Sequence, residues 1–164
     1  MLRNVCGLFV TGVTVITSGL DGRSDGTTVN SFTSVSLDPP LVLFCLHNQS
    51  RLRPMLAESG LFVVNFLAGR QERLARAFAG KQAAAFREVA HHHSVDGVPV
   101  LSDALAFLAC AIVNEIEGGD HTIYVGEVRE VGVPRHNAEP LIFFRGSLGA
   151  LEHEPVTIPP IWDG

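Results

Sequence analysis

The chain has 164 residues, of which 46% are hydrophobic and 18% are charged, and its formal net charge at pH 7 is −5. This composition fills the core of a single domain and excludes a disordered chain. The acidic balance, without a long basic run, argues against nucleic acid as a partner, because nucleic-acid-binding proteins present a basic face.

The sequence also bears on location. No apolar run approaches the roughly 18 residues of a membrane span, and the start shows no signal peptide. The three cysteines, Cys6, Cys45 and Cys110, form no CxxC motif, and the last two lie in apolar runs typical of small buried side chains. We therefore expect a cytoplasmic protein with no membrane partner, since reduced cysteines are the rule in that compartment.

The first half of the chain predicts a hairpin, a buried strand and a helix. Alternating residues 13–18 predict a strand, Asp21-Gly22 a tight turn, and residues 26–32 the returning arm. The apolar run 41–46 follows Pro39-Pro40 and is typical of a strand covered on both faces. Residues 50–59 predict a helix that starts between 50 and 53, because Pro54 is tolerated only in a first turn, and Gly60 ends it.

The second half predicts more strands than helices. Strands are expected over 61–66, 105–116, 122–133 and 141–144, and a helix over 70–79 that ends at Gly80. Gly118-Gly119-Asp120 joins the two long strands. Residues 81–98 predict a loop-rich excursion, and 152–164 an irregular Pro-rich tail after a single domain over 1–151. Hairpin-type spacing of the strands favours a mainly β, antiparallel barrel with a few short flanking helices.

Chemistry-bearing residues gather in two polar clusters. Residues 27–36 are Thr-Thr-Val-Asn-Ser-Phe-Thr-Ser-Val-Ser, and their hydroxyls either face water or line a polar ligand, because a buried polar group needs a partner. The second cluster, His47-Asn48-Gln49-Ser50-Arg51, opens the following helix. Backbone N–H groups at a helix N-terminus, with a serine hydroxyl and an arginine, suit a phosphate; the alternative is that Ser50 only caps the helix.

Residues 28–42, Thr-Val-Asn-Ser-Phe-Thr-Ser-Val-Ser-Leu-Asp-Pro-Pro-Leu-Val, closely resemble the signature of the flavin reductase-like family. These FMN-binding split-barrel proteins include the reductase components of two-component flavin monooxygenases. The likeness extends over nearly the whole chain, through residues 12–17, 48–51, 58–65, 74–79, 119–121, 125–128, 140–141 and 145–146. The resemblance implies an antiparallel split β-barrel that forms a homodimer, with the flavin at the dimer interface.

The resemblance also implies site residues for FMN, with FAD as the alternative. Residues 28–31 would meet the isoalloxazine edge, residues 34–36 would line the ribityl and phosphate side, and the loop 48–51 would hold the phosphate. The cofactor-binding residues implied in this way are Thr28, Val29, Asn30, Ser31, Ser34, Val35, Ser36, Asn48, Ser50 and Arg51, with Lys81 adding charge.

His121 is the catalytic candidate on the nicotinamide side. It follows a Gly-Gly-Asp turn, from which its ring would project into a cleft. Judged without the resemblance, it is better explained as a hairpin histidine bonded to a nearby carboxylate. The expected reaction is hydride transfer from NADH or NADPH to the flavin, for which the protein supplies orientation, and the reduced flavin would serve a partner monooxygenase.

Other interpretations stay open. The chain would otherwise be a flavin-binding electron carrier that does not use NAD(P)H, a pyridoxamine-phosphate-oxidase-like or haem-binding relative, or a barrel without a ligand. His91, His92 and His93 suggest a metal site, but adjacent histidines diverge on a strand or a helix, so no metal is expected. Cys45 is expected to pack in the core and not to react.

Overall fold

The computed structural model describes residues 1–80, 86–135 and 137–151, and this part of the chain is mainly β. Its strands are β1 (Thr11–Gly12), β2 (Thr14–Leu20), β3 (Arg23–Val29), β4 (Thr33–Leu37), β5 (Pro40–His47), β6 (Leu61–Phe66), β7 (His91–His93), β8 (Pro99–Leu101), β9 (Ala106–Gly118), β10 (His121–Gly132), β11 (Leu141–Phe144) and β12 (Ser147–Ala150). Its α-helices are α1 (Leu2–Cys6), α2 (Arg53–Ser59) and α3 (Glu72–Ala79), and short 3₁₀ turns cover Gly69–Gln71 and Phe86–Glu88.

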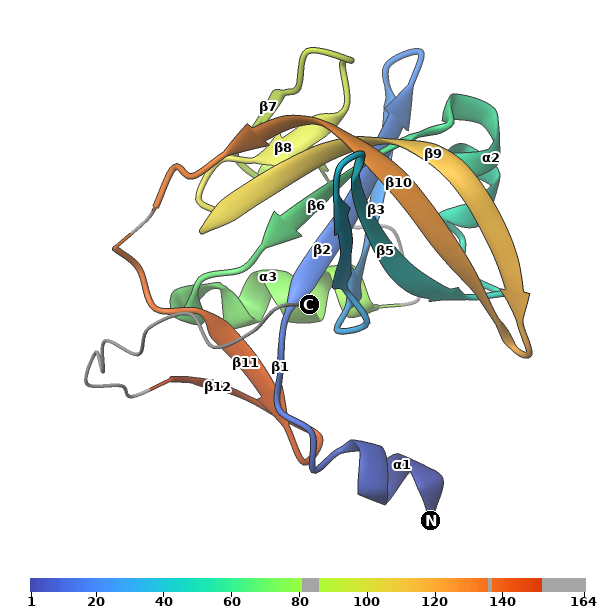
Figure 1. Cartoon of the computed structure of the whole chain (residues 1–164). Coiled ribbons are helices and arrows are strands. Elements are labelled where there is room, and N and C mark those ends of the chain that lie inside the picture. The colour runs from blue at the N-terminus through green and yellow to red at the C-terminus, as the bar shows by residue number, and fades with distance from the viewer. Residues whose placement is uncertain (81–85, 136, 152–164) are drawn as a thin grey trace.

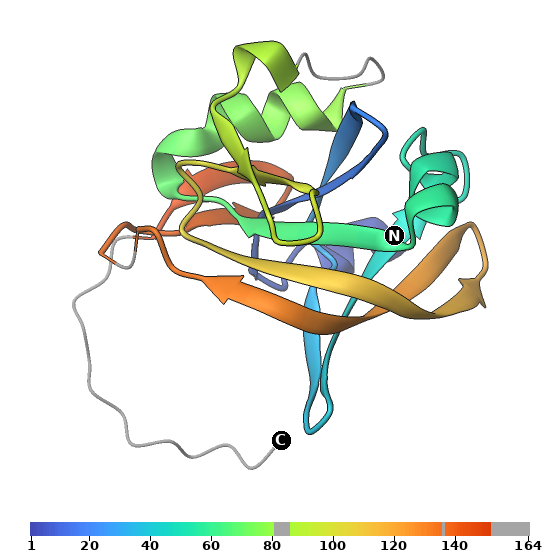
Figure 2. The ribbon, with the colours of Figure 1, turned by 90° about the horizontal axis from the view of Figure 1, so that it is seen from above.

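A seven-stranded sheet in the order β3-β2-β6-β9-β10-β5-β4 curls into the barrel (Figure 1). β1, β11 and β12 form a separate sheet at its lower end, and β7 pairs with β8 alone. All of these pairings are antiparallel, which confirms the predicted mainly β, antiparallel architecture. Figure 2 shows the β4–β5 hairpin standing clear of the barrel, while α2 and α3 lie against its ends.

The predicted turns form where residues with positive φ were expected. Asp21 and Gly22 have φ of 52° and 74° and close the β2–β3 hairpin. Gly60 ends α2 with φ of 66°, and its N–H donates to the Leu56 carbonyl. Gly119, with φ of 72°, turns the chain between β9 and β10. These predictions are therefore confirmed.

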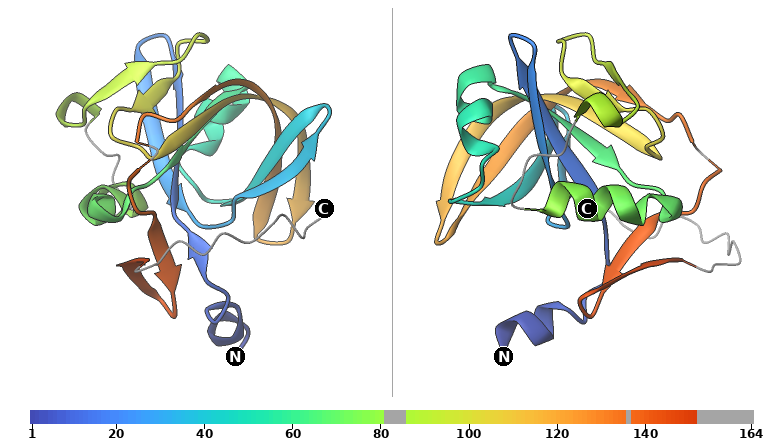
Figure 3. Two further views of the ribbon diagram at one scale, coloured as in Figure 1. Left: turned by 60° about the vertical axis from the view of Figure 1, so that its left-hand side comes forward. Right: turned by 180° about the vertical axis from the view of Figure 1, so that it is seen from behind.

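Two apolar clusters hold the barrel and its lower end together. The cluster inside the barrel is built on Phe44, Phe62 and Tyr124, all almost fully buried. The second cluster packs α3 against the barrel through Ala75 and Phe78, which explains why this helix lies flat along the sheet in Figure 3. Burial of one such large apolar side chain contributes about 1.5–3 kcal/mol.

One buried amide joins three strands. Asn65 on β6 is fully buried; its amide donates to the Val15 carbonyl and to Thr17 Oγ1, and its side-chain oxygen accepts the Leu101 N–H at 2.8 Å. A buried amide is tolerated only when paired in this way. Asn65 therefore fixes β8 against β2 and β6.

Several sequence predictions need correction. The run 41–46 is not covered on both faces: Val42, Phe44 and Leu46 are buried, whereas the residues between them are half-buried. The excursion over 81–98 contains strand β7, which pairs with β8, so it is not purely loop. The short strands β1 and β12 were not predicted, whereas β4 overlaps the hydroxyl-rich segment 27–36.

Some predictions fall outside the described residues, namely the charge contributed by Lys81 and the irregular tail 152–164. The division into a domain over 1–151 and a tail stays a prediction. Among the helices of the described residues, none is long and apolar enough to cross a membrane.

Candidate functional site

A cavity of about 770 Å³ opens where β3, the end of β5, the end of α3 and the start of β10 meet. Its volume falls within the range of about 300–1,000 Å³ that small-molecule sites occupy. The walls are formed by residues 27–31, 45–47 and 49–51, together with Ala79, Gly80 and His121. Both predicted polar clusters thus contribute residues to one cavity, together with His121 from a distant part of the chain.

In the hydroxyl-rich segment, the side chains of Thr28, Asn30 and Ser31 form hydrogen bonds to other residues of the protein. The Thr28 hydroxyl donates to the Ala75 carbonyl at 2.7 Å, and Asn30 donates to Thr11 Oγ1. The Ser31 hydroxyl bridges to β5, donating to the Cys45 carbonyl at 3.0 Å and accepting the Cys45 N–H at 2.9 Å. These bonds fix the segment against α3 and β5, so its contribution to a ligand comes mainly from the backbone.

The backbone of β3 is available because β3 is an edge strand of the sheet. Its inner edge pairs with β2. The Gly26 carbonyl points the other way, since it accepts from Arg51. Alternate residues of a strand direct their N–H and C=O groups to the same side, so Thr28 presents its backbone groups on that outer side as well. This wall of the cavity therefore carries polar main-chain groups suited to the edge of a heteroaromatic ring.

Arg51 is the lysine or arginine that lines the cavity among the described residues, and several neighbours hold it in place. Its Nη1 donates to the Gly80 carbonyl at 2.8 Å, and its Nη2 donates to the Gly26 carbonyl at 2.7 Å. Its Nε lies 3.1 Å from the Asp25 carboxylate, without the alignment of a hydrogen bond. Each Nη of a guanidinium carries two hydrogens, so one N–H on each is not used by these two bonds to the described residues. Arg51 is therefore both a brace between β3 and α3 and a fixed positive charge beside the cavity.

Two other residues of the second cluster have different positions: Ser50 lines the cavity, and Asn48 bonds to the β9–β10 hairpin. Ser50 lines the cavity, and its hydroxyl accepts the N–H of Leu52, the cap residue of α2. Asn48 faces the β9–β10 turn, where it donates to the Gly119 carbonyl and accepts from the Thr122 hydroxyl at 2.8 Å. Asn48 is absent from the cavity wall, and so are the predicted residues 34–36 on exposed β4.

His121 lines the cavity and also makes the carboxylate bond that the sequence left open. Its Nδ1 lies 2.7 Å from Asp120 Oδ1. This bond holds the pKa of the Asp120 carboxyl below its usual range. The two explanations weighed for His121, a cavity residue and a hairpin histidine, both describe its position.

Sequence reasoning assigned no site role to Asp25, which faces Arg51, or to Cys45 and His47, which line the cavity. Asp25 was missed because its partner Arg51 lies far along the chain. Cys45 was expected to be buried, but it is half-buried and lines the cavity, because the outer face of β5 is open. The signal available for His47 was its place in the second polar cluster, at the end of an apolar strand.

The chain matches the model of the flavin reductase like domain over residues 6–152. The chain belongs to the flavin reductase-like family. Among the curated members of this family, the reductase component of 4-nitrophenol 4-monooxygenase/4-nitrocatechol 2-monooxygenase from Rhodococcus opacus is 40% identical, over 90% of this chain and 78% of its own length.

Solved members of the flavin reductase-like family share the fold closely. Nitrilotriacetate monooxygenase component B from Mycobacterium thermoresistibile has a TM-score of 0.89 and 34% identity, covering 98% of this chain and 92% of that protein. The NADH:FAD oxidoreductase SgcE6 from Streptomyces globisporus has a TM-score of 0.86 and 40% identity, covering 93% and 92%. The predicted family, the split-barrel fold and the flavin reductase activity with NADH and FMN or FAD are therefore confirmed.

The histidine triplet of this family member lies outside the cavity. His91 and His93 face each other along β7, with ring centroids 5.5 Å apart, whereas His92 packs on the Phe107 ring. The diverging side chains follow the alternation expected on a strand. In the ranges that the structure describes, no group of three or more His, Cys, Asp or Glu side chains is arranged to hold a metal ion.

Proposed function

We propose that this chain reduces flavin in the 770 Å³ cavity, with FMN or FAD bound against β3 and with NADH or NADPH as the hydride donor. The observation that carries the proposal is the meeting of an edge-strand backbone, a braced arginine and two histidines in one cavity. A bound flavin supplies the acceptor for the hydride, and the residues of the chain supply position.

The chain's own groups suit each part of such a ligand. The outer backbone groups of residues 28–31 would bond to the polar edge of the ring system. The free N–H groups of Arg51, with the Ser50 hydroxyl, would hold a phosphate, because charge-assisted bonds to a guanidinium are strong. The family resemblance further implies that Lys81 would add charge to the site and that His121 would contact the nicotinamide. Asn48 would act by holding the β9–β10 turn in place.

We infer that the working unit is a homodimer. Residues 34–36 are implied in flavin binding, yet they lie on β4, in a hairpin that stands clear of the barrel (Figure 2). Val35 and Leu37 on this hairpin are 50% and 93% exposed, and a contact with a second copy would bury them. In a homodimer, the hairpin of one copy would bring Ser34, Val35 and Ser36 to the cavity of the other.

We also infer a flavin-dependent monooxygenase as partner, because several relatives are named as reductase components of such enzymes. A location in the cytoplasm is supported by the cysteines, which are all free in the structure.

The test is NADH oxidation by the purified protein with and without added FMN or FAD, followed through the absorbance of the reduced nicotinamide. We expect turnover that depends on flavin, and repetition with NADPH gives the preference between the two donors. If flavin binds but NAD(P)H is not consumed, the protein is a flavin-binding electron carrier. A haem spectrum in the purified protein would indicate a haem-binding relative. Neither outcome is compatible with the proposal.

Cysteine labelling gives an independent test of where the flavin binds. Cys45 lines the cavity, whereas burial raises the pKa of the Cys110 thiol to about 12 and keeps it unreactive near neutral pH. In a Cys6→Ser variant, which removes the exposed thiol, we expect one reactive cysteine per chain. Saturating FMN should slow its reaction with a maleimide about tenfold or more, since a ligand at 100 times its dissociation constant leaves about 1% of sites free. An unchanged rate would place the flavin elsewhere.

A further inference from the structure

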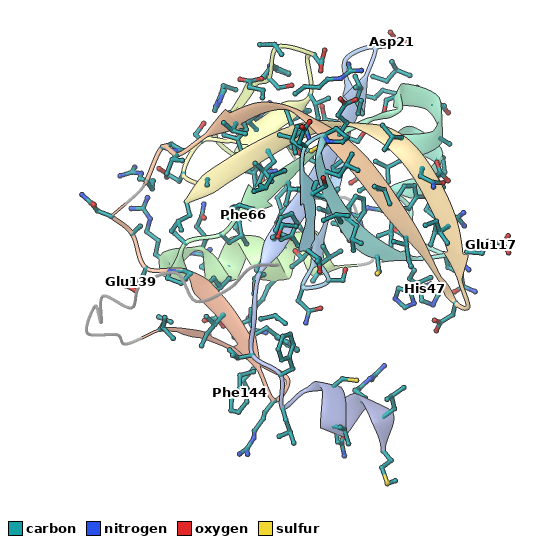
Figure 4. The ribbon with its side chains drawn as sticks, in the orientation of Figure 1. Asp21, His47, Phe66, Glu117, Glu139 and Phe144 are labelled. Carbon is teal, nitrogen blue, oxygen red and sulfur yellow. The ribbon has the colours of Figure 1, made fainter. Side chains whose placement is uncertain are left out.

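Two histidines form one wall of the cavity. His47, the last residue of β5, lies directly opposite His121, the first residue of β10, in the antiparallel pairing. Their ring centroids are 5.2 Å apart with planes at 78°, and both residues line the cavity. Figure 4 shows His47 at the end of the barrel beside the β9–β10 turn, and its side chain is exposed. The pair therefore meets a ligand together.

In each ring, the hydrogen bond at Nδ1 determines which nitrogen carries the hydrogen when the ring is neutral. His121 Nδ1 lies 2.7 Å from the Asp120 carboxylate, which can only accept, so this nitrogen carries the hydrogen. The lowered pKa of Asp120 keeps that carboxylate ionised at neutral pH. The Nε2 atom of a neutral His121 ring is therefore an acceptor.

His47 has the opposite pattern. Its Nδ1 accepts the backbone N–H of Gln49 at 3.0 Å, so in the neutral ring the hydrogen lies on Nε2. The side-by-side rings thus offer one donor, His47 Nε2–H, and one acceptor, His121 Nε2. A primary amide is the complementary group, since its carbonyl accepts and its NH₂ donates. An ionised phosphate or carboxylate can only accept hydrogen bonds, so its oxygen would face the His121 Nε2 lone pair without a hydrogen between them.

We propose that His47 and His121 together recognise the carboxamide of the nicotinamide ring, His47 donating to its carbonyl and His121 accepting from its NH₂. This assignment rests on the proposed function, because it needs a nicotinamide nucleotide in the cavity. It gives His47 a role in orienting the hydride donor, a task in which small displacements are costly to the rate.

Paired substitutions of His47 separate this role from simple packing. His47→Asn keeps an acceptor for the Gln49 N–H but loses the Nε2–H donor, whereas His47→Gln retains an N–H donor near the position of Nε2. We expect His47→Asn to raise KM for NADH about tenfold with the Kd for FMN unchanged, and His47→Gln to recover most of the loss. His93→Asn, an exposed histidine on β7, is the control and should match the wild type.

A nucleotide analogue distinguishes the two partners of the carboxamide. Reduced 3-acetylpyridine adenine dinucleotide keeps the carbonyl but has a methyl group in place of NH₂. The wild type should prefer NADH to this analogue by about tenfold in kcat/KM. His121→Asn, which retains an N–H donor for Asp120 but lacks the Nε2 lone pair, should lose that preference. His47→Asn should keep it, because its lost contact is common to both nucleotides.

Nitrogen-15 NMR of the histidine side chains checks the premise without turnover. We expect His47 with its hydrogen on Nε2 and His121 with its hydrogen on Nδ1 at neutral pH. The inference is overturned if both rings show the same tautomer, if His47→Asn leaves KM for NADH unchanged in an active enzyme, or if it changes the Kd for FMN instead. Absence of flavin-dependent NADH oxidation in the wild type would contradict the proposed function itself.

Discussion

Replacing Arg51 with methionine is expected to weaken FMN binding about 100-fold and to lower the free energy of unfolding by about 2–3 kcal/mol. The binding loss follows from the charge-assisted bonds to the phosphate, since about 1.4 kcal/mol corresponds to a factor of ten. The stability loss has a separate cause. Arg51 bonds to the Gly26 and Gly80 carbonyls and faces Asp25, whose side chain is only 13% exposed, and methionine leaves that carboxylate without its partner.

A second substitution separates the two effects. In the double variant Asp25→Asn, Arg51→Met, the unpaired charge is gone, so most of the stability should return while FMN binding stays weak. Arg51→Lys keeps the charge but cannot bond to Gly26 and Gly80 at once, and should fall between the wild type and Arg51→Met. Isothermal titration with FMN and urea unfolding measure the two quantities. If Arg51→Met binds FMN with unchanged affinity, the guanidinium does not bind the phosphate and has only a structural role.

Gly126→Ala is expected to lower the free energy of unfolding by about 3 kcal/mol, which shifts the Tm downward by about 6–12 °C in a domain of this size. A Cβ on Gly126 would overlap the Phe62 ring, lying 2.5 Å from its Cε1 and closer still to its Cζ. Phe62 has no room to withdraw, because it is fully buried and packs edge-on against Phe44 with centroids 5.0 Å apart. The strain must then be taken up by the β9–β10 ladder or by the core.

Gly12→Ala is the matched control for this prediction. A Cβ at Gly12 meets nothing within 4 Å, and this glycine is not among those with positive φ. Its substitution should therefore leave the Tm within about 2 °C of the wild type. Equal effects of the two alanines, measured by thermal unfolding followed by circular dichroism, would contradict the packing argument.

Much of the fold was predictable because its signals are local. Asp21-Gly22, Gly60 and Gly119 each mark a turn or helix end through their own backbone preference, and the structure places a positive φ at all of them. The hairpin of β7 and β8 escaped prediction for the opposite reason. Its pairing joins a histidine triplet to Pro99–Leu101 across a turn, and neither segment has a strand-like period of its own.

The sequence predicted which segments form the site, but not which of their atoms bond within the protein and which are available to a ligand. The two polar clusters do meet, and Thr28, Ser31, Ser50, Arg51 and His121 all line one cavity. What the sequence could not provide was which atoms remain free. The Ser31 hydroxyl is used by Cys45, 14 residues along the chain, and the Asn48 amide by the β9–β10 turn, 71 residues along it. Such competition for hydrogen bonds depends on the tertiary fold and has no local signature.

The contact of Phe62 with Gly126 has a counterpart at Gly132, where a Cβ would overlap the Phe107 ring in the same way. Each ring occupies the volume of the side chain that its facing glycine lacks. In evolution, neither member of such a pair is free to change alone: a larger residue at 126 or 132 requires a smaller one at 62 or 107. Aligned relatives should therefore show correlated substitution within these two pairs, even where the flavin site itself is unchanged.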